Sequence, residues 1–299
     1  MNSGHRLALS AFILAGIFIS CGLMPGVCLA EGSAYALLDG HRVHYVDTGN
    51  GKPVMVFIPG WRCDHTIWRK QAEAFANRYR LLMIDLPGHG KSTKPDVEYK
   101  HELFTRAVEA VMRNARVERA VIVGHSMGAS VARQFALKHP DMVSGLVIVD
   151  GALFQMPKDP EMLAKWKEGF KAFTNQFTGP DGEVNSKRFI SSLFIPSTPV
   201  EIQKEVIETV MDTPAYVGQS AMKNFMDPAL WSEEPVSAPT LAVYAVNQGL
   251  TPEFNAFLNR LFPNLTFVTA KGVDHFFMLA KPEVLNRPLE EFLTKLKEQ

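Results

Sequence analysis

The pentapeptide GHSMG, residues 124–128, places a serine in a turn flanked by two glycines. It follows the apolar run AVIV and opens a helical pattern that begins at Ala129. A sharp strand–turn–helix requires such glycines, because a Cβ atom would clash where the backbone folds back. The turn raises the Ser126 hydroxyl above a sheet and aims a helix N-terminus at it, which favours developing negative charge. The pattern predicts that Ser126 is a nucleophile; the alternative is a serine that only caps an ordinary helix.

A serine hydroxyl needs a general base, and His275 is the best placed histidine. It stands in GVDHFFMLAKPE (residues 272–283), between the strand-like run LTFVTA and the last helical pattern. The other histidines fit less well, since they precede the elbow, flank the nucleophile or end the helix that Ser126 starts: His65, His89, His101, His125 and His139. We therefore expect His275 to be the base.

The elements that must position these residues alternate along the chain. Five apolar runs of strand length are visible, at residues 54–60, 81–88, 120–126, 145–151 and 240–246. Amphipathic segments lie between them, for example at 101–115 and 130–139, and a last helix is expected at 282–298, interrupted by Pro288. Continuous apolar strands are typical of a parallel sheet covered on both faces. The fold class is therefore expected to be α/β, with a mostly parallel open sheet and helices on both faces.

One long stretch, from about residue 153 to 234, contains no buried-strand run. It is helix-like and rich in aromatic and methionine side chains, including Trp166, Phe170, Phe173, Phe177, Phe189, Phe194, Met211, Tyr216, Met222, Phe225, Met226 and Trp231. Because it is inserted between two sheet strands, it should emerge at their carboxyl edge, where open α/β sheets bind ligands. We expect a helical cap at 153–235, inserted after the sixth strand, between core segments 31–152 and 236–299. Some of its aromatic residues would line a pocket, although most would pack among themselves.

Together these motifs resemble the capped, single-domain α/β-hydrolase superfamily over nearly the whole chain after residue 30. VFIPGW (56–61) with Asp64 and Trp68 resembles the oxyanion-loop strand, and DLPGHGKS (85–92) resembles the next strand and turn. The resemblance implies an esterase-like serine hydrolase that needs no metal and no organic cofactor. It also implies an oxyanion hole made by the backbone N–H groups of Met127 and Trp61.

Two positions near this oxyanion loop need comment. Pro59-Gly60 stands where the family usually has His-Gly, which backbone donation from the next residue should tolerate. Cys63, two residues beyond Trp61, is expected to be a buried, inert thiol.

The third catalytic residue is missing from its usual place. In the family an acid normally follows the strand corresponding to residues 240–246, at a position occupied here by Gln248. An amide could orient a histidine but could not stabilise its protonated form. Asp150, at the end of the preceding strand, resembles the acid of those members that carry it one strand earlier. We expect Asp150 to be the acid; a purely structural Asp150 is the alternative, and Asp274, Glu253 and Asp227 are less suitable carboxylates.

Composition and the N-terminal residues limit which partners and which cellular location are expected. The 299 residues carry 31 basic and 31 acidic side chains, so nothing favours nucleic acid or an anionic membrane as a partner. Residues 1–30 combine a short positive start, an uncharged apolar run and Cys28-Leu29-Ala30, which predicts a cleaved signal peptide and an exported, periplasmic or secreted protein. A membrane anchor is an alternative, because the apolar run approaches spanning length, but Pro25 and Gly26 break it and the small residues before Glu31 favour cleavage. No membrane span is therefore expected in the mature chain. Lipoprotein anchoring through Cys21 is an alternative, although Phe18 is a poor match for the lipidation motif.

The sequence as a whole predicts an exported serine hydrolase that cleaves a small-molecule carboxylic ester with an apolar group. Thioester, lactone, amide or C–C hydrolysis and cofactor-free perhydrolysis use the same residues and remain alternatives. A dehalogenase or epoxide hydrolase would need Asp in place of Ser126. A ligand-binding protein that has lost turnover is the alternative from another class.

Overall fold

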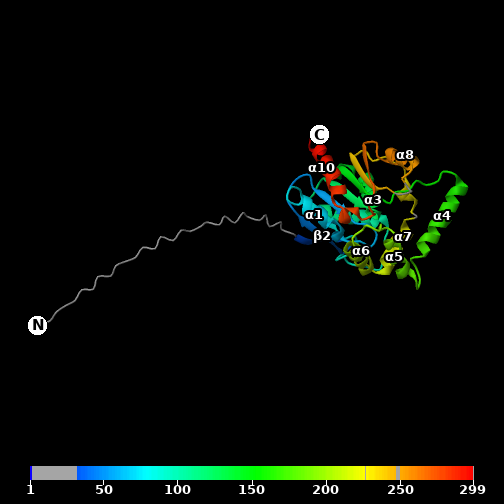
Figure 1. Ribbon diagram of the computed structural model, residues 1–299, viewed down its shortest axis with the longest axis horizontal. Helices are drawn as coiled ribbons and strands as arrows, with labels where there is room; N and C mark the ends of the chain where they lie inside the picture. The colour runs from blue at the N-terminus through cyan, green and yellow to red at the C-terminus, as the bar shows by residue number, and fades with distance from the viewer. Residues whose placement is uncertain (2–31, 226, 247–249, 299) are drawn as a thin grey trace.

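The computed structural model describes Met1 and residues 32–225, 227–246 and 250–298. The expected signal peptide and the loop residues Asn247 and Gln248 lie outside these described residues. Figure 1 shows the ribbon, coloured along the chain. Eight strands of the described residues form one sheet in the order β1-β2-β4-β3-β5-β6-β7-β8. Their bounds are β1 Gly32–Leu38, β2 His41–Thr48, β3 Met55–Ile58, β4 Leu81–Ile84, β5 Ala120–His125, β6 Val143–Val149, β7 Thr240–Ala245 and β8 Leu265–Ala270.

Strands β3 through β8 run parallel to one another, as their apolar sequences predict. Every residue of β3, β4, β5 and β7 is buried. The first two strands form an antiparallel extension that the apolar runs do not reveal, because β1 is largely exposed. The α/β class with a mostly parallel sheet is confirmed.

Helices cover both faces of the sheet. On one face α2 (His101–Asn114) and α3 (Met127–Lys138) pack together and against the strands, while α10 (Glu283–Lys297) packs on β6 and β7. The short helices α1 (Arg69–Phe75) and α9 (Phe277–Ala280) pack with α10 or with each other, and α8 (Pro252–Leu261) links β7 to β8.

Pro288 does not interrupt the last helix, contrary to expectation, but lies inside α10. A proline there removes one backbone hydrogen bond. The helix buries Leu285, Leu289, Phe292 and Leu293 along one stripe, and this burial offsets the lost hydrogen bond.

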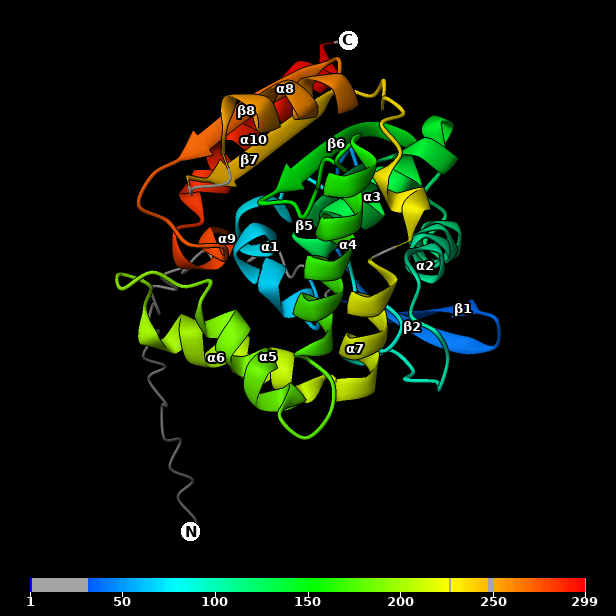
Figure 2. The ribbon, with the colours of Figure 1, turned by 90° about the vertical axis from the view of Figure 1, so that its right-hand side faces the viewer.

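Between β6, the sixth strand, and β7 the described residues form four α-helices: α4 (Pro160–Asn175), α5 (Gly182–Ser191), α6 (Val200–Asp212) and α7 (Ala215–Asn224). In Figure 2, α5, α6 and α7 lie together on the opposite side of the molecule from α8 and α10. Trp166, Phe170 and Phe173 form an aromatic stripe on α4, which contacts Phe225 and Trp231 beyond it. We call residues 153–235 the cap segment. None of the helices described here is long and apolar enough to span a membrane.

Candidate active site

Ser126 sits at the tight turn between β5 and α3. Its backbone has φ 51° and ψ −119°, a conformation that L-residues rarely adopt. A Cβ on Gly124 would lie 2.3 Å from the carbonyl oxygen of Gly128, and one on Gly128 would lie 2.4 Å from that of Ile58. Both glycines are therefore required by close backbone approach, and the turn has the geometry of a nucleophile elbow.

Backbone hydrogen bonds tie this turn to the end of β6. The Ser126 N–H donates to Val149 O at 3.1 Å, and the Ala152 N–H donates to Ser126 O at 3.0 Å. The two partners flank Asp150, so the sheet places that carboxylate beside the elbow.

Asp150 meets His275 across 125 residues of sequence. Its Oδ2 lies 2.5 Å from His275 Nδ1, and its Oδ1 accepts the backbone N–H of Ala245 at 2.9 Å. Ala245 is the last residue of β7, the strand after which the family usually carries the acid. In this chain β7 instead donates a backbone N–H to Asp150, which follows the neighbouring strand β6. Since an ionised carboxylate only accepts, Nδ1 must carry the proton, which leaves the Nε2 lone pair of His275 free to act as a base.

The other carboxylates considered above are placed differently. Asp274 accepts the hydroxyl of Thr198 and the N–H of Phe276, the latter at 2.7 Å. Glu253 lies in the exposed first turn of α8, and Asp227 is exposed beyond α7. The structure therefore brings Asp150, among these carboxylates, into hydrogen-bond contact with His275.

His125 is a site residue that sequence reasoning passed over as merely flanking the nucleophile. Its Nε2 lies 3.0 Å from the carbonyl oxygen of His275, and the two rings are 4.5 Å apart between centroids. Burial holds the pKa of His125 well below its usual range. It therefore stays neutral, and the N–H of its Nε2 donates to the His275 backbone. The sequence shows a histidine inside the elbow motif, but it does not show that this histidine contacts the His275 backbone, 150 residues away.

The expected oxyanion donors also lie at the elbow. Met127 is the first residue of α3, so its N–H has no acceptor within the helix. Gly60–Cys63 forms a turn closed by Cys63 N–H to Gly60 O at 3.1 Å, a bond that leaves the Trp61 N–H unused. A Cβ on Gly60 would lie 3.2 Å from Ser126 Cβ, so this turn, which we call the oxyanion turn, packs directly on Ser126.

Cys63, at the end of the oxyanion turn, is 1% exposed. Burial raises the pKa of its thiol well above the usual range, so the sulfur remains protonated. An unreactive buried thiol agrees with the sequence expectation.

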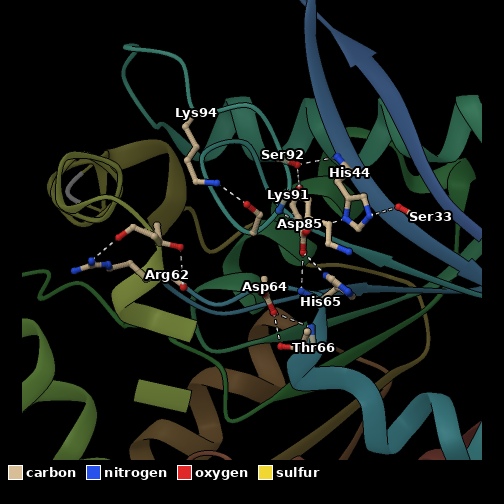
Figure 3. Close-up of polar contacts among 12 residues, drawn as sticks. Ser33, His44, Arg62, Asp64, His65, Thr66, Asp85, Lys91, Ser92 and Lys94 are labelled. Atoms are coloured by element: carbon tan, nitrogen blue, oxygen red, sulfur yellow. Dashed lines mark hydrogen bonds and ion pairs between the residues drawn. The ribbon is translucent and has the colours of Figure 1, made fainter. Parts of the chain in front are cut away.

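A polar network around the buried carboxylate of Asp85 includes His65, two residues after the oxyanion turn ends at Cys63, and His44 (Figure 3). Asp85 Oδ1 accepts the backbone N–H and Nδ1 of His65, both at 2.8 Å. Its Oδ2 accepts Nδ1 of His44 at 2.7 Å and the N–H of Lys91 at 2.9 Å. Burial would raise the pKa of Asp85, but the hydrogen bonds from His44 and His65 outweigh it and hold that pKa well below the usual range.

His44, His65 and Asp85 are also the residues that could hold a metal ion. Their ligand atoms lie within 4.8 Å of one another, the one such group in the part of the chain that the structure describes. A bound ion would have to replace the hydrogen bonds of both histidines to Asp85. Burial lowers the pKa of His65, but the hydrogen bond to Asp85 and the charges of Asp85 and Asp64 together outweigh burial and raise it, which disfavours the neutral imidazole that a metal requires. The arrangement fits a hydrogen-bonded network better than a metal centre.

Comparisons with known proteins agree with the fold. The family model described as alpha/beta hydrolase fold matches residues 53–282. Epoxide hydrolase 3 of Xenopus tropicalis is 25% identical over 290 residues, covering 85% of this chain and 75% of the relative. Pimeloyl-[acyl-carrier protein] methyl ester esterase of Vibrio cholerae is 28% identical over 261 residues, covering 83% and 96%. Among solved structures, a thermophilic esterase from Thermogutta terrifontis superposes with a TM-score of 0.73 at 23% identity, covering 89% of this chain and 99% of that one.

Proposed function

The chain belongs to the alpha/beta hydrolase fold family, and on that premise we propose that it is an exported serine hydrolase that cleaves a carboxylic ester. The observation that carries the proposal is the 2.5 Å contact between Asp150 and His275 beside the strained backbone of Ser126. A nucleophile, a base and an acid at one sheet edge are the parts that acyl transfer requires.

The reaction proceeds through an acyl-enzyme. Ser126 Oγ attacks the ester carbonyl carbon while His275 Nε2 takes the hydroxyl proton, and Asp150 stabilises the resulting imidazolium. The N–H groups of Trp61 and Met127 donate to the oxyanion of the tetrahedral intermediate. Collapse breaks the C–O bond, and His275 returns the proton to the leaving alcohol. Water, deprotonated by His275, then releases the acid and frees Ser126.

Serine at the elbow argues against epoxide opening by this chain. Epoxide hydrolase 3 is a relative by sequence, yet epoxide opening in this family would need Asp where Ser126 stands. The esterase relatives support ester cleavage, and the aromatic cap segment supports a substrate with an apolar acyl or alcohol group.

Labelling with a fluorophosphonate probe tests the nucleophile. We expect the folded protein to be labelled at Ser126 and Ser126→Ala to remain unlabelled. Hydrolysis of p-nitrophenyl esters of increasing acyl length would then define the substrate class. A folded wild-type protein that neither reacts with the probe nor hydrolyses any ester would favour the ligand-binding alternative.

Export is a separate part of the proposal and rests on residues 1–30. Expression of the full chain in a bacterium should yield a periplasmic or secreted form whose N-terminus is Glu31. Retention of residues 1–30 on the isolated protein would contradict export with cleavage, and a lipid-modified Cys21 would support the lipoprotein alternative.

A further inference from the structure

The oxyanion turn contains one residue, Arg62, whose backbone is strained and whose hydrogen-bond partners include residues of the cap segment. Arg62, the third residue of Gly60–Cys63, has φ 57°, in the left-handed region that favours glycine. A turn of this kind ordinarily places Gly or Asn there. Because Trp61 precedes it, a change in the Arg62 backbone would rotate the peptide groups of the turn that presents the Trp61 N–H.

The cap segment holds Arg62 through a reciprocal pair of hydrogen bonds. The guanidinium of Arg62 donates through Nη2 to the carbonyl oxygen of Thr213, and the Thr213 hydroxyl donates back to the carbonyl oxygen of Arg62 at 3.1 Å. Thr213 is the C-cap of α6 and is 1% exposed, as is Arg62. Two backbone carbonyls that are 151 residues apart are thus both satisfied only while this part of the cap segment is docked.

Two further contacts from the cap segment reach the same turn. Glu183, in the first turn of α5, lies 3.1 Å from Nη2 of Arg62. The indole N–H of Trp61 donates to Gly218 O, in α7, at 2.8 Å. A Cβ on Gly218 would lie 2.5 Å from Arg62 Cδ, so α7 packs against the turn without a gap.

We infer that Arg62 and Thr213 form a clamp that holds the oxyanion turn in its working shape, which makes docking of the cap segment a condition for stabilising the transition state. Both are positioning residues, since neither is assigned a contact with the reacting atoms. The inference rests on the proposed function, in which the Trp61 N–H donates to the oxyanion. Its consequence is that a substrate or partner that displaces α6 from the core would weaken catalysis as well as binding.

Thr213→Val is the central test, because it removes the hydroxyl and keeps the shape of the side chain. We expect kcat for a p-nitrophenyl ester to fall by roughly 10- to 100-fold with little change in KM, as is typical when an oxyanion donor is misplaced. Thr213→Ser retains the hydroxyl and should keep nearly full kcat. Thr174→Val is the matched control, since Thr174 is a buried threonine of the cap segment whose hydroxyl donates to Lys171 O, on its own helix. It should leave kcat unchanged.

A pair of substitutions at Arg62 isolates the backbone strain. Both Arg62→Ala and Arg62→Gly remove the guanidinium, but only glycine adopts a positive φ freely. Arg62→Gly should therefore retain more turnover than Arg62→Ala, although both lose the link to the cap segment. If neither variant folds, the Thr213 series alone decides the question.

The affinity for a trifluoromethyl ketone distinguishes a role in oxyanion binding from a merely structural role, which would leave that affinity unchanged. Its adduct with Ser126 carries an oxyanion, so its affinity should fall in parallel with kcat in Thr213→Val. Normal kcat and normal ketone affinity in a folded Thr213→Val protein would overturn the clamp while leaving the proposed function intact. A wild-type protein without turnover or labelling would instead defeat the proposed function.

Discussion

At the scale of single residues, the candidate site depends on where one carboxylate lies. The family position for the acid holds Gln248, outside the described residues, and Asp150 reaches His275 from the neighbouring strand. Because β6 and β7 are adjacent and parallel, their carboxyl ends lie side by side and either could serve the same histidine. Asp150 adopts φ 41°, and the Ala245 N–H fixes its second oxygen, so its geometry is held from both sides.

Asp150→Asn tests this assignment. The amide keeps the shape of the side chain but cannot stabilise the protonated imidazole of His275, so ester turnover should fall by on the order of 10³- to 10⁴-fold. Gln248→Ala is the control and should retain most of the activity. Full turnover in a folded Asp150→Asn protein would show that another group acts as the acid.

At the scale of elements, the start of α3 lies in close contact with the end of β3. A Cβ on Gly128 would lie 2.4 Å and 2.5 Å from the carbonyl oxygens of Ile58 and Pro59. These are backbone atoms and cannot rotate away, so α3 or the oxyanion turn would have to shift. The two expected oxyanion donors lie on these same two elements, which makes their spacing sensitive to this contact.

Gly128→Ala should therefore reduce kcat by about 100-fold or more, because a shift of about 1 Å at a preorganised site has that effect. Gly169→Ala provides the opposite control, since Gly169 lies within α4 and a Cβ there meets nothing within 4 Å. That variant should keep its activity and gain about 0.5–1 kcal/mol of unfolding free energy. Unchanged kcat in Gly128→Ala would show that the contact does not set the donor spacing.

The Asp85 network is a second element-scale device, and its stability depends on pH. The pKa of Asp85 is lowered in the folded protein, so its contribution is fully present above the unfolded value of about 4 and is lost as the pH falls below it. Asp85→Asn should lower the free energy of unfolding at pH 7 by about 2–3 kcal/mol, as for a buried, charged hydrogen-bond acceptor. Urea unfolding between pH 7 and pH 3 measures this difference.

The difference between wild type and Asp85→Asn should shrink as the pH falls from 4 to 3. Asp39→Asn is the matched control, because Asp39 pairs with Arg106 at the surface with a half-exposed side chain. Its effect should stay within about 0.5 kcal/mol. A pH-independent difference for Asp85→Asn would mean that the carboxyl is not ionised in the folded protein.

At the scale of the whole molecule, the cap segment is connected to the core at several separated points. Leu193 O accepts the N–H of His275 at 3.3 Å, and Thr198 donates to Asp274, so the histidine loop is also bound to the cap segment. On the return to the core, Arg133 of α3 donates to the carbonyl oxygens of Ser232 and Glu234, both at 2.6 Å. The helix α3, which begins directly after Ser126, therefore also binds the chain where it returns from the cap segment to the sheet.

Arg133→Met tests this return point. Burial lowers the pKa of Arg133 to about 10, so the group is still charged at neutral pH and donates to both carbonyls. Methionine fills similar volume but leaves the two carbonyls without this donor, so the melting temperature should fall, with a loss of about 1–3 kcal/mol in unfolding free energy. The kcat of the folded variant should stay near that of the wild type. Equal thermal stability would show that the carbonyls find other donors at no cost.

Much of the core could be predicted from sequence because its signals are local. Continuous apolar runs mark the parallel strands, and GHSMG marks the elbow, since glycines there answer a steric need of the adjacent backbone. The edge strand β1 lacked such a signal because one of its faces is exposed. Pro288 misled the prediction of α10, because burial of a leucine-rich stripe outweighed one missing hydrogen bond.

The sequence by itself determined which residue types could do the chemistry, together with the strands and turns that carry them. Only the tertiary structure decided which of them meet. The contacts of Asp150 with His275, of His125 with the His275 backbone, and of Arg62 with Thr213 span 125, 150 and 151 residues. The physical reason is that strand order, crossover helices and the docking of the cap segment set these distances, and none of them is written in local residue patterns.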